Sequence, residues 1–158
     1  MRKRIISTSH HETPFPDQEE WLNVEKLAEV EITSEDADYP IESALLHKRT
    51  SGWRASGNGK QIIRLIFSYP QRLRRIWLKF VETETERTQE YVLRWSADGG
   101  ESFVEIVRQQ WNFSPHGSTC EMEDHRVELS AITILELSII PDISGGNAVA
   151  SLSQFRIA

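Results

Sequence analysis

The stretch from Tyr91 to Val107 constrains the fold of this chain more than any other part of the sequence. Residues 91–95 alternate in character with a period of two, which is typical of a β-strand with one more buried face. The sequence DGG at 98–100 follows, and glycine accepts the positive φ angles that a tight reversal needs. Residues 103–107 resume an apolar run rich in β-formers. The stretch predicts a β-hairpin and therefore an antiparallel β domain.

Other apolar segments extend this prediction to an all-β fold, an antiparallel β-sandwich or jelly roll of about eight strands. The expected strands are residues 28–33, 61–68, 75–81, 91–95, 103–107, 121–129, 132–140 and 151–157. Residues 47–60 and 109–120 are expected to be loops, and Tyr69-Pro70 is expected to start a turn between two strands.

The amino-terminal part is less regular. Residues 1–20 predict an arm, followed by a single β-sandwich domain over residues 21–158. Asp17 is placed to cap a short helix through about Ala28, while an extended segment is the alternative because Val24 and Val30 interrupt good helix formers. Residues 41–46 predict one helical turn after Pro40.

Composition excludes several classes of protein. Hydrophobic residues make up 39% of the 158 residues, and five are Trp, which argues for a packed core. The net charge of −6 argues against a nucleic-acid partner, although Arg72, Arg74 and Arg75 form a local basic group. No stretch approaches the ~20 apolar residues of a membrane span. Cys120 is the only cysteine and no signal-peptide core is present, so we expect a cytoplasmic protein.

Several motifs, taken in order, resemble those of discoidin domains, also called coagulation factor 5/8 type C domains, which have the galactose-binding-like fold. They are PIESAL at 40–45 followed by TSGW at 50–53, the strand pair at 61–80 with Pro70, the SADGG turn at 96–100, and the strands at 135–139 and 151–157. The resemblance covers residues 28–158 and implies an eight-stranded jelly roll. Its end loops would bind glycans, phospholipid head groups or proteins, and catalysis would be rare.

The chain departs from that family in two respects. It cannot form the disulfide that joins the termini of many extracellular members, which favours a bacterial-type intracellular member. The acidic positions that hold a structural calcium ion in many members correspond here to His47-Lys48-Arg49 and Gln154. Lysine and arginine side chains provide no oxygen ligand, so we expect no metal and no cofactor.

The candidate ligand site lies in the expected loop at 109–120. Trp111, Asn112, Phe113 and His116 combine flat aromatic faces, which stack on the C–H face of a sugar, with groups that bond its hydroxyls. The neighbouring loop would add Arg49, Arg54 and Asn58. Two alternatives remain open: the two aromatic residues fold back as a small core of the loop, or they form a protein-binding hot spot.

Other residues have simpler interpretations. Trp53 is expected to seal one end of the barrel rather than to hold ligand. Asp36, Asp38 and Asp142 are expected to be solvated turn residues rather than cation ligands, and Glu82, Glu84 and Glu86 a solvated strand face.

No catalytic motif is present, and Cys120 has no adjacent base. The sequence therefore predicts a non-catalytic ligand-binding module, carbohydrate-binding through its end loops, with an intracellular protein–protein interaction adaptor on the same fold as the alternative. The partner would be a glycan or a protein, and the oligomeric state stays open.

Overall fold

The computed structural model describes residues 21–46, 48–49 and 51–158, so the expected arm at 1–20 lies outside the described residues. Its elements are α2 (Val24–Leu27), β1 (Ala28–Ile32), α3 (Glu42–Leu45), β2 (Trp53–Asn58), β3 (Gln61–Val81), β4 (Arg87–Ser96), β5 (Val104–Phe113), β6 (Cys120–Ile140), β7 (Val149–Leu152) and β8 (Gln154–Ile157). All strand pairs are antiparallel. The predicted all-β sandwich of eight strands is confirmed.

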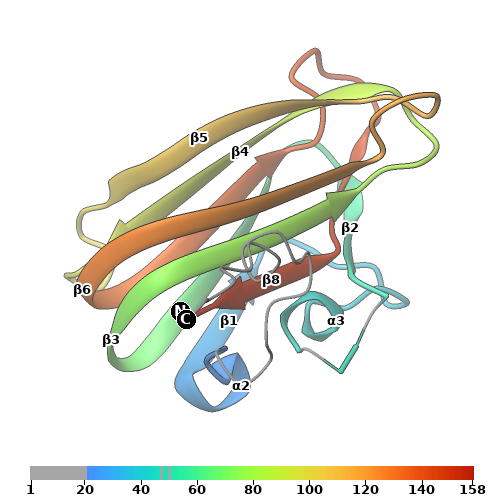
Figure 1. Ribbon diagram of the computed structural model, residues 1–158. Helices are drawn as coiled ribbons and strands as arrows, with labels where there is room; N and C mark the ends of the chain where they lie inside the picture. Colours follow the sequence, from blue (N-terminus) through green and yellow to red (C-terminus); the bar gives the residue numbers. More distant parts are fainter. Residues whose placement is uncertain (1–20, 47, 50) are drawn as a thin grey trace, which may run out of the picture.

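Two strands of 21 residues, β3 and β6, pass from one layer of the sandwich to the other (Figure 1). The first half of β3 and the second half of β6 lie in one layer, in the order β1-β3-β6-β4-β5. The remaining halves pair again in the second layer, where β8 adds to the edge of β3. A straight strand of this length would span about 70 Å, so both strands must bend within a domain of this size.

The bend explains where the expected strands were wrong. Residues 61–68 and 75–81 are one strand, and so are residues 121–129 and 132–140. The register between β3 and β6 shifts three times between Ile66 and Arg75. Pro70 cannot donate a backbone hydrogen bond, which loosens the pairing locally, but both strands continue with the same partner beyond it. The turn expected at Tyr69-Pro70 is therefore a bulged bend.

The hairpin predicted at 91–107 is confirmed by the pairing of β4 with β5. Gly99 and Gly100 have φ angles of +74° and +98°, the left-handed values that the turn requires. The carboxylate of Asp98 closes the turn by accepting the Ser102 N–H at 2.9 Å. Hydrogen bonds from Ser102 and Ser96 lower the pKa of Asp98 to about 2.

The remaining local predictions have mixed outcomes. The strand expected at 28–33 and the helical turn expected at 41–46 are confirmed as β1 and α3. The helix expected to begin at Asp17 begins at Val24, and its residues 17–20 lie outside the described residues. The loop expected at 47–60 contains β2, which pairs with β7. The closing strand expected at 151–157 is divided between β7 and β8.

The core lies between the two layers and is closed at one end by Trp53. Leu65, Leu78, Leu93 and Leu137, from four different segments of the two layers, have no exposed surface. Trp53 is 1% exposed, and its indole nitrogen donates to the Ser34 carbonyl oxygen at 3.1 Å. This bond satisfies the one polar group of a side chain that is otherwise packed in apolar surroundings, as expected for a residue that seals the barrel.

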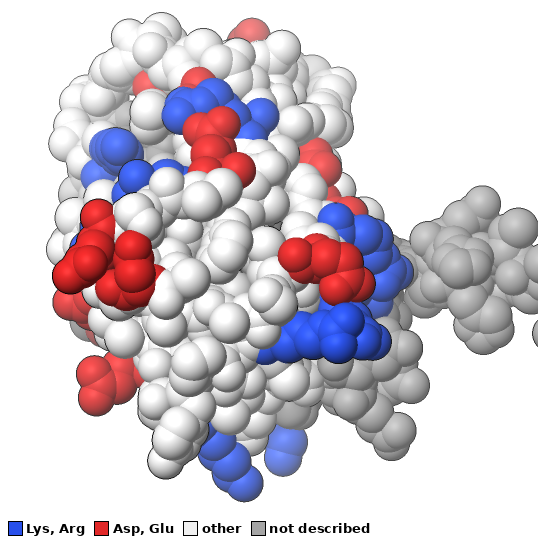
Figure 2. Space-filling model, turned by 90° about the vertical axis from the view of Figure 1, so that its left-hand side faces the viewer, with Lys and Arg blue, Asp and Glu red and all other residues white. Residues whose placement is uncertain are grey.

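Charges of both signs lie side by side on the face shown in Figure 2 rather than forming one basic field. Two members of the basic group noted in the sequence form ion pairs. Arg72 Nη2 lies 3.4 Å from Glu128 Oε2, and Arg75 Nε lies 2.8 Å from Asp124 Oδ1. In the described part of the chain, no helix has the length and apolar character needed to cross a membrane.

Candidate functional site

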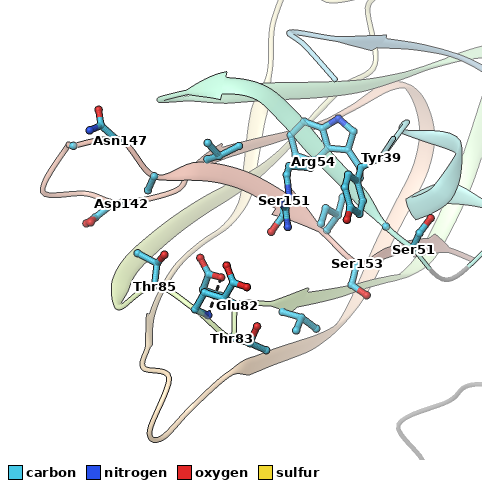
Figure 3. A pocket seen from close by; sticks show the side chains of 18 of the residues that line it. Tyr39, Ser51, Arg54, Glu82, Thr83, Thr85, Asp142, Asn147, Ser151 and Ser153 are labelled. Carbon is cyan, nitrogen blue, oxygen red and sulfur yellow. Dashed lines mark hydrogen bonds between the residues drawn. The ribbon is translucent and has the colours of Figure 1, made fainter. Parts of the chain in front are cut away.

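A cleft of about 750 Å³ opens beside Trp53 at the loop end of the sandwich. One wall is the β2–β7 ribbon together with Tyr39, which precedes α3; the other is formed by residues 81–85, at the end of β3 and beyond it. Figure 3 shows Arg54, Tyr39 and Ser151 facing Glu82, Thr83 and Thr85 across this space, with Asp142 and Asn147 at one end. The lining is rich in hydroxyl, carboxylate and backbone groups.

Arg54 is brought to the cleft by strand alternation. Its neighbours Trp53 and Ala55 are buried in the core, so a period of two directs the Arg54 side chain outward. The Arg54 N–H donates to the Tyr39 carbonyl oxygen at 3.1 Å, which ties β2 to the segment before α3. The Arg54 guanidinium carbon lies 4.8 Å from the centre of the Tyr39 ring, a cation–π contact. The exposed guanidinium is thereby positioned over an aromatic face.

Glu82, on the opposite wall, is anchored by a buried arginine. Arg87 Nε lies 3.0 Å from Glu82 Oε1, an ion pair that lacks hydrogen-bond alignment. The Arg87 side chain is 2% exposed and that of Glu82 is 21% exposed. Arg87 also donates to the Pro141 carbonyl oxygen at 2.9 Å. Burial lowers the pKa of Arg87, and the charge of Glu82 opposes that shift.

Asp142 belongs to a tight turn after β6. Its Oδ1 accepts the Ser144 N–H at 3.1 Å and the Ser144 hydroxyl at 2.6 Å. These hydrogen bonds lower the pKa of Asp142, so it stays ionised well below neutral pH. The Ile143 N–H donates to the Thr88 carbonyl oxygen at 2.9 Å, which fixes the turn against β4. A carboxylate therefore sits at a defined place at the end of the cleft.

The residues predicted for the site are separated by the structure. Arg54 lines the cleft, and Asn58 reaches its rim, where its Nδ2 lies 3.5 Å from Asn147 Oδ1. Arg49 and His116 are exposed in turns that do not line the cleft. Asn112 is exposed on β5, and its Oδ1 accepts the Thr88 hydroxyl at 2.6 Å.

The prediction of a loop at 109–120 is wrong in its first half, because β5 continues through Trp111 and Phe113. Phe113 pairs with Arg87 in the register of β4 and β5 and is 1% exposed. Its ring centre lies 5.4 Å from the Arg87 guanidinium carbon. Trp111 is half-buried against the core. Both side chains continue the inward alternation of β5, which removes the Phe113 ring from the surface available to a ligand.

Sequence reasoning missed Tyr39, Glu82 and Asp142 as members of one site. Glu82 was interpreted as part of a solvated face, and Asp142 as a solvated turn residue. Asp142 does stand in a turn, in which Gly145 and Gly146 have φ angles of +88° and +87°. The only local signal was the accumulation of turn-forming residues in DISGGN at 142–147, because the partners of these side chains lie far away in the sequence.

A second polar cluster lies inside the sandwich. Glu121 is 1% exposed, and Gln89 Nε2 lies 3.5 Å from its Oε1. Burial and the neighbouring Glu123 raise the pKa of Glu121 to about 8. Nearby, the Tyr91 hydroxyl lies 2.7 Å from His125 Nε2, and burial lowers the pKa of His125. The raised pKa favours the protonated form of Glu121, which costs less to bury than the carboxylate.

Within the described ranges, no three His, Cys, Asp or Glu side chains are grouped to hold a metal ion. Asp36 Oδ1 instead accepts the Asp38 N–H at 2.9 Å, the hydrogen bond of a turn-forming aspartate.

Comparison with known proteins relates the fold to a group of sugar-binding modules. No protein-family model and no curated protein matches the amino-acid sequence. Solved structures do match. A pectin-binding carbohydrate-binding module is 15% identical, with 83% of this chain and 89% of that chain covered and a TM-score of 0.58.

Two further structures belong to carbohydrate-binding module family 32. The module of AlyQ in complex with 4,5-unsaturated mannuronic acid is 15% identical, with 84% and 95% covered and a TM-score of 0.59. The module of C. perfringens NanJ in complex with galactose is 13% identical, with 82% and 92% covered and a TM-score of 0.61. This chain therefore has the galactose-binding-like β-sandwich fold that these modules share.

Proposed function

We propose that this protein is a non-catalytic carbohydrate-binding module that holds a glycan in the cleft beside Trp53. The observation that carries the proposal is the pairing of an exposed guanidinium over an aromatic ring, Arg54 over Tyr39, with the carboxylate of Glu82 on the facing wall. Carboxylates accept hydrogen bonds from sugar hydroxyls, and a guanidinium donates to hydroxyl or ring oxygens. The cleft is open and of the size of small-ligand sites.

The fold neighbours support the same proposal, since their names record pectin, unsaturated mannuronic acid and galactose as ligands. We propose that the chain acts without a catalytic centre, as a bacterial-type module of the cytoplasm, and without a nucleic-acid partner. The mixed charges of the face in Figure 2 support the last point.

Arg54→Ala tests the proposal. Losing the hydrogen bonds of one charged donor costs about 1.5–3 kcal/mol, so the variant should bind a glycan identified on an array about 10- to 150-fold more weakly. Because Arg54 is exposed, its melting temperature should stay within about 2 °C of the wild type. The matched control is Arg72→Ala, an exposed arginine in the bend of β3, which should bind like the wild type.

The other polar residues that the sequence predicted for the ligand site are tested in the same assay. Asn112→Ala, His116→Ala and Arg49→Ala change exposed side chains outside the cleft, and Asn58→Ala changes its rim. If Arg54→Ala bound as well as the wild type while Asn112→Ala or His116→Ala bound much more weakly, the ligand site would lie at the end of β5 and not in the cleft. Failure of the wild type to bind any neutral or charged glycan would refute a carbohydrate-binding function.

A further inference from the structure

Carboxylates outnumber guanidinium groups among the described charged side chains that line the cleft. Three carboxylates, those of Glu82, Glu84 and Asp142, share it with one guanidinium, that of Arg54. Arg87 neutralises Glu82 from the interior, but with 2% of its side chain exposed it is not accessible to a ligand. Among the described lining residues, a ligand therefore meets one accessible cation, Arg54, and two carboxylates that no ion pair neutralises, Glu84 and Asp142.

The carboxylates stand on one wall and at one end of the cleft. The Glu84 N–H lies 3.5 Å from Glu82 Oε2, so both residues belong to the wall of the cleft formed by residues 81–85. Asp142 stands at the end of the cleft, where its turn is tied to β4 through Ile143 and Thr88.

The same carboxylates would interact differently with a neutral hexose, which has a hydroxymethyl group at C6, and with a uronic acid, which has a carboxylate there. A hydroxymethyl group donates a hydrogen bond to a carboxylate, and such a charge-assisted bond is stronger than a neutral one. A uronate carboxylate cannot donate, and it is repelled by each carboxylate of the lining. This repulsion is weak in bulk water and stronger near a protein surface, where the effective dielectric constant is lower. Among the described residues that line the cleft, only the guanidinium of Arg54, which lies over Tyr39, can offset this repulsion.

We propose that the cleft takes a neutral hexose unit and rejects the corresponding uronic acid, with Glu84 and Asp142 as the residues that determine this specificity. The inference rests on the proposed carbohydrate-binding function and adds the charge class of the ligand. It separates this chain from the fold neighbours whose names record pectin and unsaturated mannuronic acid.

The test uses pairs of sugars that differ only at C6. Galactose is compared with galacturonic acid, glucose with glucuronic acid and mannose with mannuronic acid, by calorimetry on the full chain at low and high salt. For the sugar that binds, the neutral member should be at least tenfold tighter at low salt. The difference should shrink at high salt, because screening weakens repulsion between exposed charges. Equal or tighter binding of the acid would overturn the inference while leaving the proposed function intact.

Charge variants assign the effect to residues. Glu84→Gln combined with Asp142→Asn removes two negative charges while keeping side-chain oxygens that accept hydrogen bonds, including the acceptor for Ser144. This double variant should bring the neutral-to-acid ratio to within about threefold of unity. Glu101→Gln, an exposed change in the β4–β5 turn, is the matched control and should keep the wild-type ratio. An unchanged ratio in the double variant would overturn the assignment. No binding of any sugar would instead refute the proposed function.

Discussion

Arg87 Nε lies 3.0 Å from Glu82 Oε1, so a buried guanidinium on β4 fixes a carboxylate on the wall of the cleft. The same arginine bonds the Pro141 carbonyl oxygen just before the turn that carries Asp142. One core residue thus connects the wall that carries Glu82 with the turn that carries Asp142.

The first prediction concerns this pair. Arg87→Met should lower the free energy of unfolding by about 3–5 kcal/mol, since it removes one partner of a largely buried ion pair. Glu82→Gln should also destabilise the fold, because Arg87 loses its counter-charge. The double variant should lose less than the sum of the two single variants, as measured by urea denaturation. Strictly additive losses would show that the pair contributes no coupling energy.

The second prediction concerns the backbone at the edge of the cleft. Gly52 has a φ angle of +75°, and a Cβ atom there would lie 2.9 Å from the Leu152 carbonyl oxygen. Gly52→Ala should therefore cost at least about 1–3 kcal/mol of stability.

Gly57 is the matched control for Gly52. It lies in β2, and a Cβ atom there would have no described neighbour within 4 Å. Gly57→Ala should be neutral or stabilise the fold by up to about 1 kcal/mol. Equal melting temperatures for the two alanine variants would contradict the close approach of β7 to Gly52.

The third prediction is a pH dependence that originates at Glu121. Its pKa rises from 4.5 to about 8 on folding, chiefly because the carboxyl group is buried. Between these values the folded state binds a proton that the unfolded state has released, so the free energy of unfolding should fall as pH rises from 4.5 to 8.

A variant isolates this contribution. Glu121→Gln keeps the shape of the side chain and cannot ionise, so its stability should vary less over the same pH range. Denaturation curves at pH 5 and pH 8 measure the effect, and the difference between wild type and variant should be larger at pH 8. Parallel curves for the two proteins would assign the pH dependence to groups other than Glu121.

The fourth prediction separates a strand from a loop at the end of β5. Phe113→Ala should lower the free energy of unfolding by about 3–5 kcal/mol, because it empties a fully buried aromatic site. His116→Ala, an exposed change three residues further on, should stay within about 0.5 kcal/mol of the wild type. If both variants lost similarly little stability, the Phe113 side chain would be exposed in solution, contrary to the structure.

Local patterns identified the hairpin and the fold class. The alternation at 91–95 and the glycines at 99 and 100 predicted β4, its turn and β5, because a strand's period of two and a glycine's left-handed φ are properties of neighbouring residues. The order of short motifs predicted the galactose-binding-like sandwich. Arg54 was predicted as a donor from a loop; in the structure it lines the cleft from β2, where it points outward between two buried residues.

The cleft itself depended on contacts that no short pattern contains. Glu82 acts with Arg54 and Asp142 because strands far apart in the sequence end at the same edge of the sandwich. Phe113 is buried because β5 keeps pairing with β4. Burial raises the pKa of Glu121, whose hydrogen-bond partner Gln89 lies 32 residues away in the sequence. Sequence alone identified most of the segments that form strands, through the local alternation of side chains, but not β2 or the end of β5. Tertiary structure decided where long strands bend and which side chains meet, because pairing and burial depend on distant segments.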